Sequence, residues 1–206
     1  MNLTLALASF AVFILSVIVH EISHGLAALS QGDGTAKYQG RLTLNPLKHI
    51  DPVGSIFVPL LCLLSGSGFM FGWAKPVPYN PYNLRNGRWS ELWVAIAGPL
   101  SNIIIALVFG LFLRFYVNSL PDATLNILAV LVEVNIVLAV FNMVPLPPLD
   151  GSKVLLNILP FRMAAKIRPY FERYGLVLTL VFILFLWQYS TPLIVGLFGA
   201  ITGISL

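Results

Sequence analysis

Four long stretches of this chain carry almost no charge. Residues 1–19, 92–113 and 174–206 are uncharged, and Glu133 is the one charge in residues 123–144. Each stretch reaches or approaches the roughly 20 residues that a helix needs to span a bilayer. Only 10% of the residues are charged, against about a quarter in soluble domains. The sequence therefore predicts an integral, multi-pass protein embedded in a lipid bilayer.

The predicted fold class is an all-α polytopic membrane protein that forms one membrane-embedded domain over residues 1–206. The first helix is expected at 3–29, where the turn signal SQGDG follows. Short β-strands are expected near 36–44 and 72–79 because β-branched, aromatic and proline residues gather there. The last stretch, 175–206, is long enough for one kinked helix or for two segments. Four to six membrane segments result.

Residues 51–72 are apolar but broken by Pro59 and several glycines, so they either cross the membrane or re-enter on the same side. A re-entrant segment places nearly all lysines and arginines on one side, which the positive-inside rule makes cytoplasmic. It also lets the first helix and the helix at 123–144 run in the same direction. We therefore expect four spanning helices plus a re-entrant 51–72.

The net charge of +4 comes from lysines and arginines in the connecting segments, so it indicates topology rather than binding of nucleic acid. A single cysteine, Cys62, excludes a disulfide within the chain. The N-terminus lacks the basic region of a signal peptide, so we expect its helix to be retained. The sequence makes no prediction about the oligomeric state.

The motif HEISH lies at the inner end of the first predicted helix. One helical turn separates His20 from His24, so their imidazoles share a face and can bind one zinc ion, with Glu21 placed as general base. Ala27 and Ser30 exclude the soluble metzincin continuation. A catalytic zinc needs a third ligand, and spacing alone leaves five candidates: His49, Asp51, Glu91, Glu133 and Asp150.

Asp150 has the most suggestive surroundings of the five. It is the last residue but one of the stretch FNMVPLPPLDG, whose prolines cannot continue the helix before them. Irregular backbone at membrane depth is tolerated where it lines a protein or water-filled cavity, so this segment would present Asp150 to such a cavity. The alternative is an ordinary turn in which Asp150 caps the helix that follows.

The segments HEISHG, AGPLSN and FNMVPLPPLDG, in this order, resemble the site-2 protease family of intramembrane zinc metalloproteases. The resemblance covers nearly the whole chain and matches compact members that have no PDZ-like insertion and no helix ahead of HExxH. It implies one zinc ion held by His20, His24 and Asp150, with Glu21 as general base and acid. It also suggests that Asn102 and Asn142 position the substrate.

Other polar residues have alternative readings. Asn102 and Asn135 could form hydrogen bonds between helices instead. Glu133 lies nine residues before Asn142, about 180° around the helix, so it is expected to face away from the zinc. His49 and Asp51 are expected to line an approach to the site. Trp73, Lys75 and Val77 are expected in an extended edge that pairs with unwound substrate.

The sequence thus predicts a zinc endopeptidase that cleaves a transmembrane protein or peptide within or beside its membrane segment. We expect a bacterial plasma membrane and an active site nearer the cytoplasmic face. The alternative is a non-proteolytic membrane protein that uses the same residues to bind zinc or other proteins. Internal repeats typical of transporters are not found, and Glu21 is present, so the protease is favoured.

Overall fold

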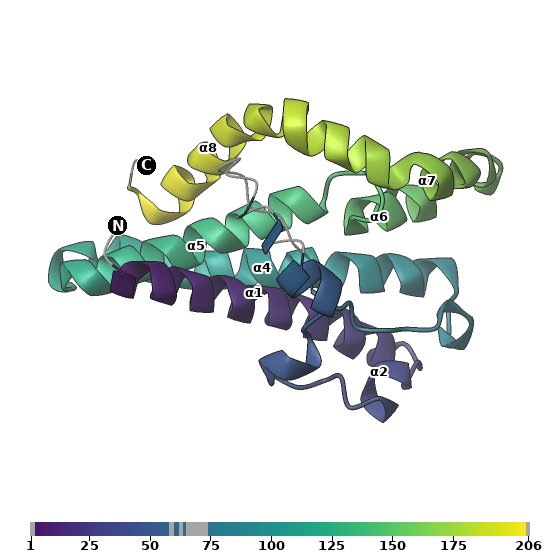
Figure 1. Ribbon diagram of the computed structural model, residues 1–206, viewed down its shortest axis with the longest axis horizontal. Coiled ribbons are helices and arrows are strands. Elements are labelled where there is room, and N and C mark those ends of the chain that lie inside the picture. Colours follow the sequence, from purple (N-terminus) through teal and green to yellow (C-terminus); the bar gives the residue numbers. More distant parts are fainter. Residues whose placement is uncertain (1–2, 58–59, 62–63, 65–73, 205–206) are drawn as a thin grey trace.

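The computed structural model describes residues 3–57, 60–61, 64 and 74–204, and every regular element in these ranges is helical (Figure 1). Four helical paths are long and apolar enough to cross a membrane, as predicted. Three are the helices α1 (Leu3–Ser30), α4 (Arg88–Tyr116) and α5 (Asp122–Asn142). The fourth joins α7 (Phe161–Val181) to α8 (Thr191–Thr202) through a π-helix, Phe182–Leu186, and a 3₁₀ turn, Trp187–Ser190.

The helices α1 and α5 run in the same direction, as predicted, and α4 runs antiparallel to both (Figure 1). The backbone N–H of Arg85 donates to the carbonyl of Gln31 over 2.9 Å, so the chain leaves α1 and enters α4 at the same end of the bundle. At this end α5 ends as well, and a turn leads into the short helix α6 (Asp150–Ile158). The histidines of α1 and the start of α6 are therefore brought to the same depth.

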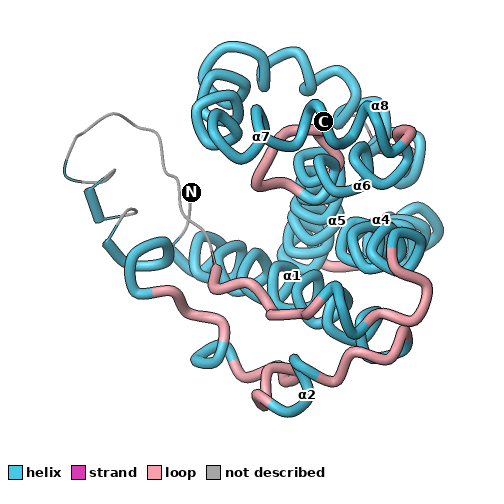
Figure 2. Tube along the Cα trace, turned by 90° about the vertical axis from the view of Figure 1, so that its right-hand side faces the viewer, coloured by secondary structure: helices cyan, strands magenta, loops and turns pink. Residues whose placement is uncertain are grey.

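Two groups of buried side chains hold the bundle together. The first joins α4, α5 and α8 through Ala106, Leu113, Val132, Ile136, Ile194 and Phe198. The second joins the last turns of α1 to α4 and the loop before it, through Ala27, Ala28, Leu84 and Val94. Helix α4 therefore packs against α1, α5, α6 and α8, and α1 also packs directly against α5 (Figure 2).

The strand predicted at 36–44 is wrong. Thr35–Tyr38 forms the short helix α2, and Gly40 has a φ of 61°, which ends any extended run. Ala36 is 1% exposed and packs beside Gly25 of α1. A single helical turn buries this alanine under α1 and satisfies its backbone locally, so the alternating side-chain pattern does not produce a strand.

The strand predicted at 72–79 is also not formed in its described part, residues 74–79. The segment is extended, but its backbone donors bind separate groups rather than a neighbouring strand: Lys75 donates to the His49 carbonyl and Val77 to the Glu21 carboxylate. Pro76 and Pro78 carry no N–H at all. The edge that carries these two prolines therefore has no donors for a neighbouring strand, and none of the described residues forms a strand beside the other edge.

Most of the predicted re-entrant segment 51–72 lies outside the described residues. Its described start, Pro52–Phe57, is a π-helical turn of 6 residues, too short to span a bilayer. The other short elements are 3₁₀ turns at Pro46–Lys48, Pro81–Asn83 and Val117–Ser119. They lie in the connections, where Asn45 and Asn80 accept hydrogen bonds that start the first two turns.

Candidate metal centre and active site

Three side chains from two distant parts of the chain meet in the C-terminal half of α1. The Nε2 atoms of His20 and His24 lie 3.1 Å apart, and each lies 3.1 Å from Oδ2 of Asp150. All three side chains are buried. His20 and His24 share one face of α1, and Asp150 is the first residue of α6. Three atoms that can bind a metal thus form a nearly equilateral triangle.

The triangle fits a zinc ion in its spacing and in its chemistry. Zinc bonds of about 2.0 Å in tetrahedral geometry separate neighbouring ligand atoms by about 3.3 Å, close to the 3.1 Å found here. Two imidazoles and one carboxylate are a typical catalytic ligand set, which leaves the fourth position for water or substrate. A search of the described residues for groups of histidine, cysteine, aspartate and glutamate that could hold a metal ion finds these three side chains.

Hydrogen bonds on the far side of each ring fix both imidazoles. Nδ1 of His24 donates to the backbone carbonyl of Val94 over 2.7 Å, and Nδ1 of His20 donates to Oδ1 of Asn102 over 2.6 Å. Both partners are oxygen acceptors, so the proton of each neutral ring is on Nδ1. The lone pair of each Nε2 is then free for a metal, which is the usual arrangement behind metal-binding histidines.

Asn102 is itself held by a second pair of buried residues. Its Nδ2 donates to Oδ1 of Asn135 on α5 over 2.8 Å, and Nδ2 of Asn135 donates to Oγ of Ser16 on α1 over 2.9 Å. Asn102 and Asn135 are fully buried, and Ser16 is 2% exposed. These bonds determine which end of the Asn102 amide faces His20. Both polar groups of Asn102 are thus engaged within the protein.

Two glycines allow the elements of the site to approach each other. A Cβ added to Gly98 of α4 would lie within 3 Å of the rings of His24 and His20. A Cβ added to Gly151 would meet the carbonyl oxygens of Met143 and Val144. The first glycine lets α4 pack directly on the histidines, and the second lets α6 begin against the turn after α5. The glycines of AGPLSN and LDG are therefore required by close packing.

Glu21 is oriented by a backbone group from the extended segment. Its Oε2 accepts a hydrogen bond of 2.8 Å from the N–H of Val77. Val77 stands between Pro76 and Pro78 in the sequence KPVPY, so it carries the one backbone N–H of these three residues. That donor goes to the carboxylate beside the metal ligands, and it leaves Oε1 of Glu21 for other contacts.

Three residues hold the extended segment 74–80 in place. Arg41, 7% exposed, donates through Nη2 to the carbonyls of Lys75 and Pro76 over 2.8 and 3.2 Å. The carbonyl of His49 accepts from the N–H of Lys75, and Asp33, with no exposed surface, accepts from the N–H of Asn80 over 2.7 Å. The position of the Val77 N–H is therefore determined by buried polar contacts on both sides of it.

Asp150 faces one group of opposite charge on the side away from the two histidines. Its Oδ1 lies 3.8 Å from Nζ of Lys153, whose ammonium lies 5.3 Å from the centre of the Tyr79 ring. Burial opposes ionisation of Asp150, whereas the positive charge of Lys153 acts in the opposite direction and lowers the pKa of this carboxyl. The carboxylate form, which binds metals, is favoured.

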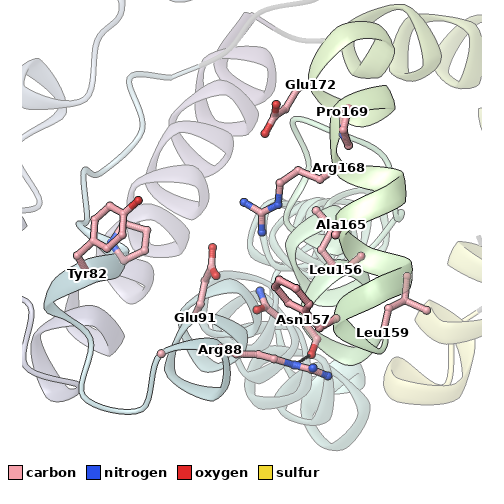
Figure 3. A pocket seen from close by; sticks show the side chains of 14 residues that line it. Tyr82, Arg88, Glu91, Leu156, Asn157, Leu159, Ala165, Arg168, Pro169 and Glu172 are labelled. Carbon is pink, nitrogen blue, oxygen red and sulfur yellow. Dashed lines mark hydrogen bonds between the residues drawn. The ribbon is translucent and has the colours of Figure 1, made fainter.

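The remaining sequence candidates lie elsewhere. His49 is buried and donates through Nε2 to the carbonyl of Thr43 over 2.8 Å, and Asp51 accepts from the N–H groups of Val53 and Gly54. The amide of Asn142 donates to the Leu138 carbonyl of its own helix. Glu91 lines a cavity of about 500 Å³ between the start of α4, α6 and α7, with Arg88, Arg168 and Glu172 (Figure 3). None of the three candidate metal ligands lines this cavity.

Several contributors to the site were missed by sequence reasoning. The Val94 carbonyl and the Val77 N–H are backbone groups, which leave no signal in residue identity. The position of Ser16 could have been predicted from the sequence. It lies four residues before His20 and therefore on the same face of α1. Asn135 was expected to form hydrogen bonds between helices. In the structure it bonds to Asn102 of α4 and to Ser16 of α1.

The fold and the site define a class: a helical membrane protein with a buried group of two histidines and one aspartate that could hold a metal ion. Comparisons with known proteins agree with this class. The model of Peptidase family M50 matches residues 116–186. The Bacillus subtilis protein named "Putative zinc metalloprotease YwhC" is 39% identical over 188 residues, which cover 87% of this chain and 78% of the relative.

Other organisms have similar proteins that are also named putative zinc metalloproteases. MJ0611 of Methanocaldococcus jannaschii is 31% identical, covering 71% of this chain and 72% of the relative. Rip2 of Mycolicibacterium smegmatis is 30% identical, covering 69% of this chain and 54% of the relative. No solved structure gives a significant match. This chain belongs to Peptidase family M50, the site-2 protease family, and is a metallopeptidase.

Proposed function

We propose that this metallopeptidase hydrolyses a peptide bond within or next to a transmembrane segment of another membrane protein. One zinc ion per chain would be held by His20, His24 and Asp150. The observation that carries the proposal is the triangle of ligand atoms, 3.1 Å on each side, at the end of helices long and apolar enough to span a bilayer. A substrate that reaches this depth is itself in or beside the membrane.

When bound, zinc polarises the scissile carbonyl and makes water a nucleophile at neutral pH. Glu21 serves as the general base and then as the acid that gives its proton to the leaving amine. The Val77 N–H holds Oε2 of Glu21, which orients the carboxylate so that Oε1 can exchange protons. Both imidazoles stay in one tautomer because their Nδ1 protons are engaged by Asn102 and Val94.

The two asparagines have different proposed roles. Asn102 is fully buried and bonded to His20 and Asn135, so we assign it to positioning His20 rather than to binding substrate. Asn142 is half-buried at the end of α5, just before the turn that delivers Asp150. It remains our candidate for a hydrogen bond to the substrate carbonyl.

A bacterial plasma membrane is the proposed location, with the active site nearer the cytoplasmic face. The support for this orientation is charge. Helix α1 carries no lysine or arginine, whereas basic residues follow it at Lys37, Arg41 and Lys48 and flank the start of α4 at Arg85 and Arg88. These residues lie at the end of the bundle that contains the metal centre, and such residues stay in the cytoplasm.

The test uses protein purified in detergent and a panel of single-span substrates. Wild type is expected to bind one zinc ion per chain and to cleave within or beside the span. Glu21→Gln is expected to retain zinc and to lose cleavage by at least about 10²-fold, the usual contribution of a general base. Equal cleavage by both proteins would refute the role of Glu21. Cleavage confined to soluble peptides would refute the membrane substrate.

A further inference from the structure

Glu133 is an ionisable residue near the middle of α5 that has no role in the metal centre. It is the twelfth of the 21 residues of this helix. Its half-buried side chain lines a groove of about 210 Å³, whose other walls are Phe13 of α1 and Val134, Val137 and Leu138 of α5. No other lining residue of the groove carries a charge or a hydrogen-bonding side chain.

Among the described residues, the Glu133 carboxyl forms no hydrogen bond and no ion pair. A carboxyl group at membrane depth is costly, and such groups usually pair with another side chain or line a functional path. Phe13, on the opposite wall, is 43% exposed. The groove therefore presents one acidic group in apolar surroundings and opens to what lies outside the bundle.

Helices α1, α5 and α8 of a second copy of this chain carry no cation that could match the Glu133 carboxyl. Residues 1–36, 115–152 and 174–206 contain no lysine or arginine, and these ranges include α1, α5 and α8. At the end of α4, Arg114 donates to the Ala200 carbonyl over 2.8 Å. We therefore look to a different protein for a basic side chain that reaches Glu133 within the membrane.

The groove lies along the path to the metal centre. Phe13 precedes His20 by seven residues on α1, which corresponds to about 10 Å at 1.5 Å per residue. Helices α1 and α5 run side by side in the same direction (Figure 2). A segment lying along them would cover the same 10 Å with about seven helical residues, or about three residues once unwound.

We propose that this groove receives the transmembrane segment of the substrate and that Glu133 pairs with a lysine or arginine in that segment. The inference rests on the proposed function, because it assigns part of the substrate's specificity to a site outside the metal centre. The basic residue would lie about three to seven residues from the scissile bond, on the side that remains in the membrane. Cleavage would then favour spans with a positive charge at this distance.

The test compares two synthetic single-span peptides that differ at one position, Lys or Leu, five residues from the cleaved bond. Binding is measured by fluorescence in nanodiscs with zinc-loaded Glu21→Gln, which leaves the peptide intact. The Lys peptide is expected to bind about threefold to thirtyfold more tightly than the Leu peptide, a range set by polar pairs between membrane helices. In the double variant Glu21→Gln, Glu133→Gln, this ratio should fall to about one.

Ile127→Gln is the matched control, because Ile127 is an exposed residue of α5 six positions before Glu133. It should leave the Lys-to-Leu ratio unchanged. Equal ratios with and without Glu133 would overturn the proposal. So would a Glu133→Gln variant that changes the oligomeric state without changing the ratio, since the carboxyl would then pair within an assembly of this chain.

Cleavage of the same two peptides by wild type separates this inference from the proposed function. Binding that depends on Glu133, without any cleavage, would refute the protease and leave the groove assignment standing. Cleavage of both peptides at equal rates, with equal binding, would support the protease and refute the groove assignment. Moving the lysine to ten residues from the cleaved bond should remove its advantage, because the side chain would no longer reach Glu133.

Discussion

The backbone N–H of Val77 donates to Oε2 of Glu21 over 2.8 Å, and this bond joins the extended segment to the proposed general base. The flanking prolines leave no other N–H within residues 76–78 that could replace it. The arrangement assigns a function to the residue order Pro-Val-Pro. It keeps the segment extended and directs its single donor toward the active site.

Removing this donor should reduce the rate of cleavage without removing zinc. Val77→Pro deletes the N–H, and we expect the maximal rate to fall about 10- to 100-fold, with KM and zinc content little changed, because the carboxylate is no longer oriented. Val77→Ala keeps the N–H and is the control for the lost side chain. Similar rates in the two variants, measured at equal zinc content, would contradict the role of the N–H.

Gly98 should be required for metal binding. Gly98→Ala places a methyl group against the rings of His24 and His20, so α4 must shift and the Val94 carbonyl with it. We expect zinc affinity to fall about 10- to 100-fold, as when the groups that orient ligands are disturbed. Competition with a zinc chelator measures this. Gly196→Ala in α8, where an added Cβ meets nothing within 4 Å, should bind zinc as wild type does.

Asn102 should influence zinc affinity through His20. Asn102→Ala removes the acceptor of the His20 Nδ1 proton, and we expect zinc affinity to fall about 10- to 100-fold. Asn102→Asp keeps an acceptor at this position and should retain more zinc than Asn102→Ala. If both variants bound zinc with wild-type affinity while cleavage was lost, Asn102 would contact the substrate, as the sequence first suggested.

Asn135 should contribute mainly to stability. Asn135→Ala leaves the buried Nδ2 group of Asn102 without its acceptor, which costs about 1–3 kcal/mol. The midpoint of thermal unfolding in detergent should therefore fall. Ser16→Ala removes the other end of the same chain of bonds, where Asn135 keeps the Leu131 carbonyl as an acceptor, so its effect should be smaller. A larger effect of Ser16→Ala would contradict this order.

Asp33 should make folding sensitive to acid. Burial opposes its ionisation, but hydrogen bonds from Thr35, Asn80 and Asn83 outweigh burial and lower its pKa below the usual 3.8. Because the folded pKa lies below the unfolded one, the stabilisation is complete above about pH 4 and is lost as the pH falls through the folded value. Thermal unfolding of wild type and Asp33→Asn should differ at pH 7, and the difference should shrink steadily as the pH falls below about 4. A difference that persists undiminished would contradict this.

The sequence predictions succeeded where structure depends on local properties and failed where it depends on contacts between residues far apart in the chain. The uncharged stretches predicted four membrane-length helices because hydrophobic length is a local property that each helix carries by itself. The strands at 36–44 and 72–79 were wrong because local β-propensity was outweighed by tertiary contacts: the burial of Ala36 under α1, and the binding of the Val77 N–H to Glu21. Neither contact has a signature within the segments themselves.

The sequence by itself determined that His20, Glu21 and His24 share one turn of a membrane helix, since helical spacing follows from residue number alone. From the residues alone, five candidates remained for a third ligand. Only the tertiary structure decided that Asp150, 130 residues after His20, lies 3.1 Å from its Nε2, and that Asn102, Asn135 and Ser16 form a chain of bonds behind it. These contacts between distant residues depend on how α1, α4, α5 and α6 pack. The packing is set by the shapes of the buried surfaces across the whole bundle.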